Sequence, residues 1–160
     1  MPIVERLQEF LEKNHIRFTH TIHPEAYRAV EVARAEHLPP HKIAKTIVFL
    51  GDQGYGLAVL PADFLVDLQE LRYMLGLSHL RLATEEEMAE LFPDCELGAM
   101  PPFGNLYNMP VYVDGSLADE ETIAFNAGTH RDVMHLAYAD FKALVKPGVV
   151  AFSTVPRGHR

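Results

Sequence analysis

Three short segments of this sequence combine polar side chains with a backbone suited to a binding site. In the first, Lys45 stands between Ala44 and Thr46, just before the apolar run of residues 47–50. An ammonium ion at the start of a buried strand can bind a phosphate or hold an ester carbonyl by charge and hydrogen bonds. A lysine that protects an exposed sheet edge from aggregation has the same pattern. The position alone leaves both interpretations open.

The second segment is rich in glycine and proline. It consists of Gly98, Ala99, Met100, Pro101, Pro102, Phe103 and Gly104. Prolines restrict the backbone, and glycines let it approach a ligand closely. Such a loop can hold N–H groups that stabilise a developing oxyanion, and Phe103 can form the wall of a pocket. A rigid crossover packed on the core is the alternative interpretation.

The third segment follows a predicted strand and surrounds a polar cluster with small residues. It consists of Phe125, Asn126, Ala127, Gly128, Thr129, His130, Arg131 and Asp132. His130 can position a water molecule or bind substrate, and Arg131 can contact a phosphate. The alternative is a turn in which Asn126 and Thr129 satisfy nearby backbone groups.

Other catalytic patterns are absent from the sequence. The pairs His20/His23 and His37/His41 lack a third metal ligand, and Cys95, the single cysteine, has no clear histidine partner. There is no Gly-x-Ser-x-Gly elbow, and no phosphate-binding or dinucleotide-binding glycine pattern. We therefore expect neither a metal nor another cofactor, and no side-chain nucleophile.

Together, the three segments resemble the YbaK/ProX family of trans-editing aminoacyl-tRNA deacylases. The strings K-T-I-V-F, G-A-M-P-P-F-G and F-N-A-G-T-H occur in the order and spacing typical of that family, and the resemblance spans roughly residues 15–150. The sequence is also similar to the editing insertion of bacterial prolyl-tRNA synthetases. Each string is weak evidence by itself, whereas the three in order are specific.

The resemblance implies hydrolysis of the ester that joins a mis-attached amino acid to the terminal adenosine of tRNA. The implied catalytic residues are Lys45, Gly98 and His130. The implied substrate-binding residues are Thr46, Ala99, Met100, Pro101, Pro102, Phe103, Gly104, Asn126, Ala127, Gly128 and Thr129. The third segment resembles the branches that edit alanine or small hydroxylated amino acids, so alanine or a similar small amino acid on a tRNA such as tRNA-Pro is the expected substrate.

Water is the implied nucleophile, oriented by His130 or by the ribose hydroxyl of the substrate. The expected partners are the acceptor end of aminoacyl-tRNA and an aminoacyl-tRNA synthetase that delivers it. Two other functions remain open at this stage: a binding module for aminoacyl-tRNA or an amino acid without turnover, and a histidine-dependent metal hydrolase.

Hydrophobic periodicity predicts an α+β fold with one compact domain over residues 1–152 and a flexible tail over 153–160. The expected sheet is curved, mixed and mostly antiparallel, flanked by helices, and the resemblance adds a partly open, barrel-like shape. Predicted helices are 3–14, 27–37, 67–76, 84–91 and 138–145, and a capping box of Thr84 and Glu87 opens the fourth. Predicted strands are 17–22, 43–50, 55–60, 80–82, 110–113, 122–127, 133–136 and 149–152. Strands 43–50 and 55–60 are expected to form a hairpin, and a turn is expected at Asp114-Gly115. Residues 94–110 are expected to form a structured loop.

Charge and composition restrict the class of protein further. The formal net charge of the 160 residues is −8, which disfavours broad contact with a nucleic-acid backbone. The acidic side chains concentrate in residues 51–125, so the two ends of the chain can form a less negative mouth. No apolar run approaches the roughly 20 residues of a membrane span, and the start lacks a secretory pattern. We expect a cytoplasmic protein that does not contact membranes.

Overall fold

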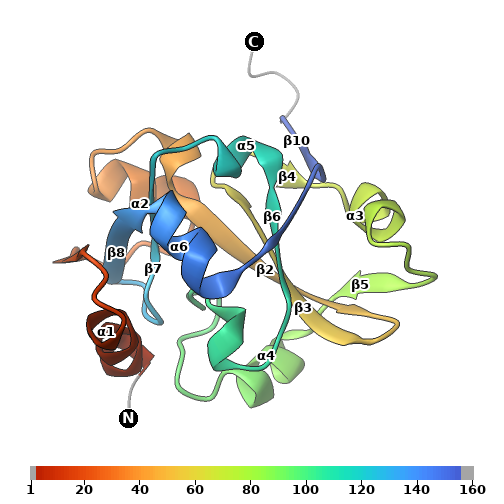
Figure 1. The fold of residues 1–160 in the computed structure, drawn as a ribbon, viewed down its shortest axis with the longest axis horizontal. Coiled ribbons are helices and arrows are strands. Elements are labelled where there is room, and N and C mark those ends of the chain that lie inside the picture. Colours follow the sequence, from red (N-terminus) through yellow and green to blue (C-terminus); the bar gives the residue numbers. More distant parts are fainter. Residues whose placement is uncertain (1–2, 156–160) are drawn as a thin grey trace.

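The structure is a computed structural model that describes residues 3–155, and sheets form its centre (Figure 1). The strands are β1 (Phe18–Ile22), β2 (Ala44–Gly51), β3 (Gly54–Pro61), β4 (Leu65–Val66), β5 (Leu80–Leu82), β6 (Val111–Asp114), β7 (Thr122–Asn126), β8 (Asp132–Ala137), β9 (Gly148–Val150) and β10 (Ser153–Thr154). One sheet has the order β5-β2-β3-β6-β9, a second has β1-β8-β7, and β4 pairs with β10. Strand β6 runs parallel to β3 and β9, whereas the other pairs are antiparallel. The predicted α+β fold with a mixed, mostly antiparallel sheet is confirmed, and the barrel is not closed within the described residues.

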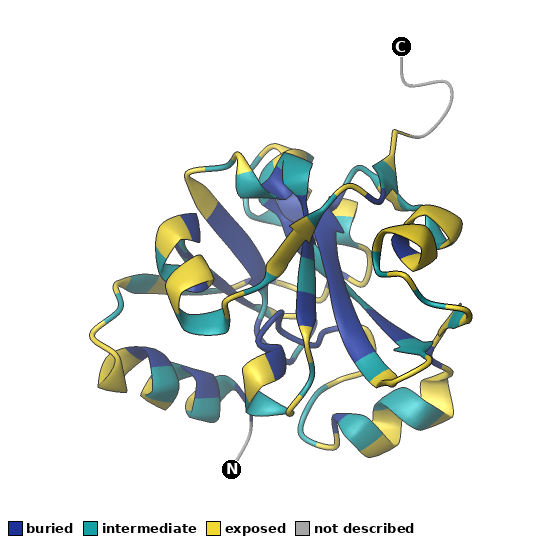
Figure 2. Cartoon of the chain, turned by 45° about the vertical axis from the view of Figure 1, so that its right-hand side comes forward, coloured by how far each residue is buried: buried dark blue, intermediate teal, exposed yellow. Residues whose placement is uncertain are grey.

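Helices lie around the sheets and turn their buried sides inward (Figure 2). They are α1 (Ile3–Lys13), α2 (Ala29–Ala35), α3 (Leu68–Met74), α4 (Glu85–Leu91), α5 (Gly115–Ala118) and α6 (Tyr138–Val145), with short 3-10 turns at Pro40–Lys42 and Gly104–Leu106. In α1, Ile3, Leu7 and Leu11 recur every four residues and are all buried, because this spacing places them on one helix face. Among residues 3–155, no helix has the length and apolar character needed to cross a bilayer.

The hairpin of β2 and β3 is the centre of the largest sheet. The two strands pair along their whole length, from Ala44 opposite Pro61 to Gly51 opposite Gly54. Residues 56–61 of β3 are all buried, because other elements cover both faces of this strand. The predicted hairpin is therefore confirmed, and its rigidity fixes where the side chains of β2 point.

One edge of β2 is left open between the two larger sheets. On this edge β5 pairs only with Phe49–Gly51 of β2. Just before β2, Ile43 forms an isolated parallel bridge to Ala124 of β7. On this edge, residues 44–47 therefore lie between β5 and β7 and pair with neither of them. This gap determines the position of the candidate site.

Two parts of the fold differ from the sequence-based predictions. The turn expected at Asp114-Gly115 is the start of α5, because the Asp114 carboxylate accepts a hydrogen bond from Ser116 N at 3.1 Å. The same carboxylate accepts from Phe152 N at 2.8 Å and Ser153 N at 3.0 Å. Where a flexible tail was expected from residue 153, the structure has the short strand β10, paired with β4. Residues 156–160 of that tail lie outside the described residues.

Candidate active site

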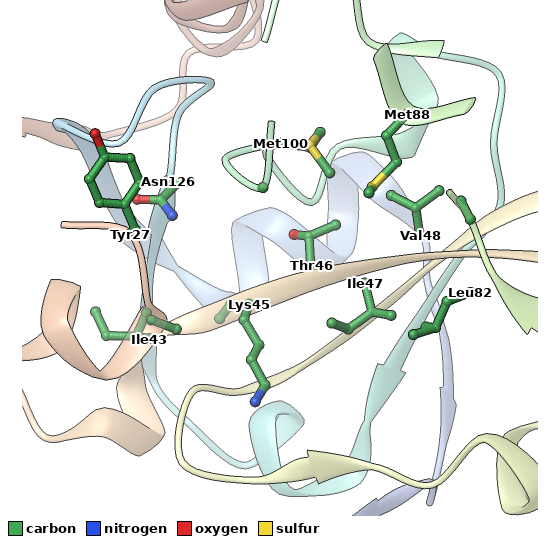
Figure 3. A pocket seen from close by; sticks show the side chains of 14 residues that line it. Tyr27, Ile43, Lys45, Thr46, Ile47, Val48, Leu82, Met88, Met100 and Asn126 are labelled. Atoms are coloured by element: carbon green, nitrogen blue, oxygen red, sulfur yellow. The ribbon is translucent and has the colours of Figure 1, made fainter. Parts of the chain in front are cut away.

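A cavity of about 300 Å³ occupies the gap beside β2. Residues 44–48 of β2 form its floor, and Leu82 and Ala83 close one end. Met88 of α4, and Gly98 and Met100 of the glycine–proline loop, form further walls. Asn126 at the end of β7 and Tyr27 lie toward the other end (Figure 3). The cavity therefore draws on all three segments that the sequence singled out.

Thr46 presents both its side chain and its backbone to this cavity. Side chains alternate along a strand, and Thr46 and Val48 lie on the same side of β2 as Met88 and Met100 (Figure 3). The C=O of Val48 accepts a hydrogen bond from Ala83 N at 2.9 Å, so it points to the open edge. Because alternate residues direct their backbone groups to the same edge, the N–H and C=O of Thr46 also point there.

Two polar atoms at the cavity are buried without a partner. Thr46 Oγ1 and Asn126 Oδ1 have no hydrogen-bond partner within residues 3–155. A buried oxygen without a hydrogen bond costs on the order of 1–3 kcal/mol, so native proteins rarely keep one without a reason. Both oxygens can accept a hydrogen bond, and both belong to residues that line the cavity. A ligand with a donor group would satisfy them.

The ammonium group of Lys45 lies on the other side of β2. Its Nζ donates a hydrogen bond to the carbonyl of Ala62 at 3.3 Å, and the side chain points away from Thr46 and Met100 (Figure 3). Burial lowers the pKa of Lys45, and the nearby carboxylate of Asp63 opposes this shift. Lys45 therefore contributes to the rim of the cavity, while its charge is held beside the outer face of the strand.

Four hydrogen bonds join residues 96–99, at the start of the glycine–proline loop, to the loop after β7. Glu96 N donates to Gly128 O at 2.7 Å, and Gly128 N donates to Ala99 O at 2.9 Å. His130 N donates to the Glu96 carboxylate at 2.7 Å, and His130 Nε2 donates to Leu97 O at 2.7 Å. The two loops therefore form one rigid unit, and this unit carries Gly98, Met100 and Asn126 to the cavity.

The backbone N–H groups of Gly98 and Ala99 differ in whether they are available to a ligand. The N–H of Ala99 already donates to Glu96 O at 3.0 Å, so it is not available to a ligand. The N–H of Gly98 has no acceptor among residues 3–155, and Gly98 lines the cavity. Its φ of +85° is a backbone conformation that favours glycine. Of these two N–H groups, that of Gly98 is therefore the one that a ligand can use.

His130 stands behind the cavity wall. Its residue exposure is 8%, and it is not among the residues that line the cavity. The imidazole packs against the ring of Tyr27, with ring centroids 4.6 Å apart. Because Nε2 donates to Leu97 O, the proton of a neutral ring is on Nε2, and the buried Nδ1 has no partner within the described residues. This geometry orients the Leu97–Gly98 backbone through the ring.

Several predicted binding residues lie in the core or behind the loops. Phe103 is fully buried and packs against Phe125 at 5.4 Å and Phe141 at 5.5 Å between ring centroids. The other predicted residues that do not line the cavity are Ala99, Pro101, Pro102, Gly104, Ala127, Gly128 and Thr129. Gly104 has no space for a side chain, since a Cβ there would lie 2.4 Å from Met109 O. These residues determine the conformation of the two loops and do not contact the cavity. Arg131, which was considered for contact with a phosphate, is exposed to solvent.

Sequence reasoning missed part of the cavity wall. Tyr27, Leu82 and Met88 are lining residues that lie in segments read only as secondary structure. The sequence signal available for Tyr27 was an aromatic residue three positions after the His23-Pro24 pair, and the structure shows that its side chain is 62% exposed.

The remaining candidate chemical groups lie elsewhere. Burial raises the pKa of the Cys95 thiol to about 12, which makes it a poor nucleophile. Its sulfur lies 3.3 Å from the hydroxyl oxygen of Tyr107, outside the cavity. Among residues 3–155 there is no group of three or more His, Cys, Asp or Glu side chains placed to hold a metal ion.

Comparison with known proteins places this geometry in a family. Residues 23–144 match the aminoacyl-tRNA editing domain family. The chain is 35% identical over 97 residues to the multifunctional Ser/Thr-tRNA deacylase ProXp-y of Escherichia coli K12, covering 60% of this chain and 58% of that protein. It is 27% identical over 154 residues to the proline–tRNA ligase of Thermotoga neapolitana, covering 91% of this chain but only 25% of the ligase.

A solved structure agrees over nearly the whole fold. It is described as a candidate trans-editing enzyme for prolyl tRNA synthetase, and it superposes with a TM-score of 0.82 at 28% identity. The match covers 96% of this chain and 98% of that one. With the family match over most of its length and this agreement in fold, the chain belongs to the YbaK/ProX family of aminoacyl-tRNA editing domains.

Proposed function

We propose that this protein hydrolyses the ester bond between a mis-attached small amino acid and the end of a tRNA. The observation that carries the proposal is the pair of unsatisfied oxygens, Thr46 Oγ1 and Asn126 Oδ1, at a cavity whose other side chains are mainly apolar. An aminoacyl ester has a free α-ammonium group, which donates up to three hydrogen bonds. This group matches two acceptors that have no donor among the described residues.

The rest of the cavity suits a small apolar side chain. Val48, Met88 and Met100 are apolar neighbours of Thr46 on the same side of β2. A hydroxyl group against this wall would lose hydrogen bonds to water, whereas a methyl group would not. Steric exclusion by the same wall would reject larger amino acids. We therefore propose alanine as the amino acid, attached to tRNA-Pro, whereas the name of the Escherichia coli relative refers to Ser/Thr-tRNA.

The proposed reaction needs no side-chain nucleophile. Water adds to the ester carbonyl, and the resulting oxyanion accepts hydrogen bonds from the backbone N–H of Gly98 and of Thr46. The bond between the carbonyl carbon and the ribose oxygen then breaks, and the ribose oxygen takes up the proton that the water loses. This step releases the free amino acid and restores the terminal hydroxyl. His130 Nε2 is bound to Leu97 O, so we propose that His130 orients the Gly98 backbone. The ribose hydroxyl of the substrate would then orient the attacking water.

Lys45 fits the role of a phosphate anchor better than that of a carbonyl ligand. Its Nζ is directed away from Thr46, toward Ala62 O, on the outer side of the rim. In the proposed complex only the aminoacyl group enters the cavity, so a phosphate of the terminal nucleotides would lie outside it. The lysine would then exchange its bond to Ala62 O for a stronger charge-assisted one.

The partners follow from this proposal. The acceptor end of an aminoacyl-tRNA would bind at the rim, where the exposed ring of Tyr27 lies. We further propose that the protein acts in the cytoplasm and receives its substrate from an aminoacyl-tRNA synthetase. The likeness to a segment of proline–tRNA ligases supports a connection with the prolyl enzyme.

Removing the two unpaired oxygens should weaken recognition of the amino acid. Thr46→Val and Asn126→Ala should each lower kcat/KM for Ala-tRNA-Pro by roughly 10- to 100-fold, because a hydrogen bond to a charged group contributes about 1.5–3 kcal/mol. The controls are Thr122→Val and Asn105→Ala, which change the same residue types at exposed positions outside the cavity. Wild-type kcat/KM in both cavity variants would contradict the proposed ammonium site.

A further inference from the structure

A chain of polar contacts runs from helix α1 to the loop that carries Asn126. Gln8 Nε2 of α1 lies 3.0 Å from His20 Nδ1 of β1. His20 Nε2 lies 2.6 Å from the carboxylate of Asp132, the first residue of β8. The other oxygen of that carboxylate accepts a hydrogen bond from Thr129 Oγ1 at 2.6 Å. The chain thus connects three elements to one loop.

The chemistry of the groups fixes the direction of each hydrogen bond. A carboxylate only accepts, so the proton of a neutral His20 ring must be on Nε2. The lone pair on Nδ1 then accepts from the amide N–H of Gln8, which agrees with the placement of Gln8 Nε2. His20 and Asp132 have side-chain exposures of 21% and 19%, so the surrounding protein covers most of the pair. His20 is therefore held from both sides in one orientation.

Asp132 closes the loop between β7 and β8. Its backbone C=O accepts from Ala127 N at 2.9 Å. Thr129 Oγ1, bound to its carboxylate, accepts in turn from Asp132 N at 2.9 Å and Arg131 N at 3.1 Å. The carboxylate that His20 orients thus fixes the turn over residues 127–132. Asn126 directly precedes this turn, and its Oδ1 is one of the two unsatisfied oxygens at the cavity.

We propose that His20, supported by Gln8, is a positioning residue for deacylation that acts through Asp132 and Thr129 on Asn126. The proposal rests on the proposed function, in which Asn126 binds the amino acid. His20 does not line the cavity, so its effect on substrate must pass through the loop. His20 and Gln8 both precede residue 23, where the family match begins, so this part of the site lies outside the matched segment.

The same pair of strands provides a matched control. His135 of β8 lies 2.8 Å from the Glu36 carboxylate, and its side-chain exposure is 26%. His135 resembles His20 in burial and in having a carboxylate partner. Its partner, Glu36, lies at the end of α2 and not in the loop that carries Asn126. His20→Ala and His135→Ala should therefore reduce thermal stability to a similar extent. Only the first should reduce catalysis at a temperature at which both variants are folded.

The test measures kcat/KM with Ala-tRNA-Pro and the unfolding temperature of each variant of the full chain. His20→Ala should lower kcat/KM roughly tenfold or more, since a small misplacement of a positioning group can cost up to about 100-fold. His20→Gln should recover part of the loss, because its amide N–H replaces the donor at Nε2. His135→Ala should retain wild-type kcat/KM.

A double-mutant cycle separates positioning from a general loss of structure. If His20 acts through Asn126, then His20→Ala should have little further effect in an Asn126→Ala background. A loss of transition-state stabilisation in the double variant equal to the sum of the two single losses, or wild-type kcat/KM in His20→Ala, would overturn the inference. If Asn126→Ala itself has wild-type kcat/KM, the proposed role of Asn126 in binding the amino acid is contradicted, and with it the positioning role of His20. If Asn126→Ala is impaired and His20→Ala is not, only the positioning role is overturned.

Discussion

Replacing Lys45 by alanine should lower kcat/KM for Ala-tRNA-Pro by roughly 100-fold while the protein remains folded. The reason is the loss of a charge-assisted hydrogen bond to phosphate, which contributes about 1.5–3 kcal/mol. The fold should survive because the Lys45 side chain is partly exposed and makes one hydrogen bond, to Ala62 O. Single-turnover deacylation and thermal unfolding measure the two effects.

The position of the kinetic loss distinguishes the two roles considered for Lys45. If the ammonium binds phosphate in both the ground state and the transition state, the loss should appear mainly in KM. A loss confined to kcat would instead indicate contact with the developing oxyanion. Lys42→Ala, which removes a neighbouring lysine outside the cavity lining, is the control. Wild-type kcat and KM in Lys45→Ala would remove the lysine from the mechanism.

The lowered pKa of Lys45 adds a dependence on pH. Burial moves this pKa below its ordinary value of 10.5, and only the protonated form binds phosphate. Enzymatic turnover, corrected for spontaneous hydrolysis, should therefore decline as pH rises through the lowered value. In Lys45→Arg the guanidinium stays charged, so the remaining activity should not show this decline.

Gly128→Ala should strongly destabilise the protein. A Cβ at this position would lie 1.9 Å from Ile3 Cγ2 of α1, and the φ of +95° disfavours any residue with a side chain. Left-handed backbone costs about 1–2 kcal/mol, and overpacking costs about 1–3 kcal/mol more. The expected decrease in the free energy of unfolding is therefore about 2–5 kcal/mol. Because Gly128 also bonds to Glu96 and Ala99, activity should fall as well.

Two comparisons separate the steric and conformational parts of this effect. Gly76 also has a positive φ, of +67°, but a Cβ there meets nothing within 4 Å, so Gly76→Ala should show the conformational cost alone. In an Ile3→Ala background, Gly128→Ala should cost less than in the wild type, because the clashing Cγ2 is gone. Urea unfolding measures all these differences. A cost for Gly128→Ala no larger than that for Gly76→Ala would show that α1 does not press on the loop.

Much of the fold followed from local patterns in the sequence. The apolar periodicity of residues 3–14 and the capping box at Thr84 and Glu87 have counterparts in α1 and α4. Both signals act within one or two turns of a helix, where local chemistry decides the conformation. The tail was different, because Phe152 and Ser153 are held by hydrogen bonds to Asp114, almost forty positions earlier. No local pattern contains such a contact.

The candidate site was predictable as a set of segments and not as a set of side chains. All three segments reach the cavity, through Lys45, Gly98 and Asn126 among others. The predicted strand over 43–50 implied that Lys45 and Thr46 project to opposite faces, but it did not indicate which face adjoins the cavity, because that depends on how the strand is oriented in the sheet. The sequence also offered no reason to separate Phe103, which packs in the core, from Met100, which lines the cavity.

The most direct test of this account measures release of amino acid from separately prepared Ala-, Ser-, Thr- and Cys-charged tRNAs, with and without the protein. The account predicts release of alanine from Ala-tRNA-Pro well above the spontaneous rate, and slower release of the other amino acids. Binding of these tRNAs without any release would indicate a non-catalytic binding module. If all four esters persist at their spontaneous rates, the claim that the cavity beside β2 hydrolyses an aminoacyl ester is contradicted.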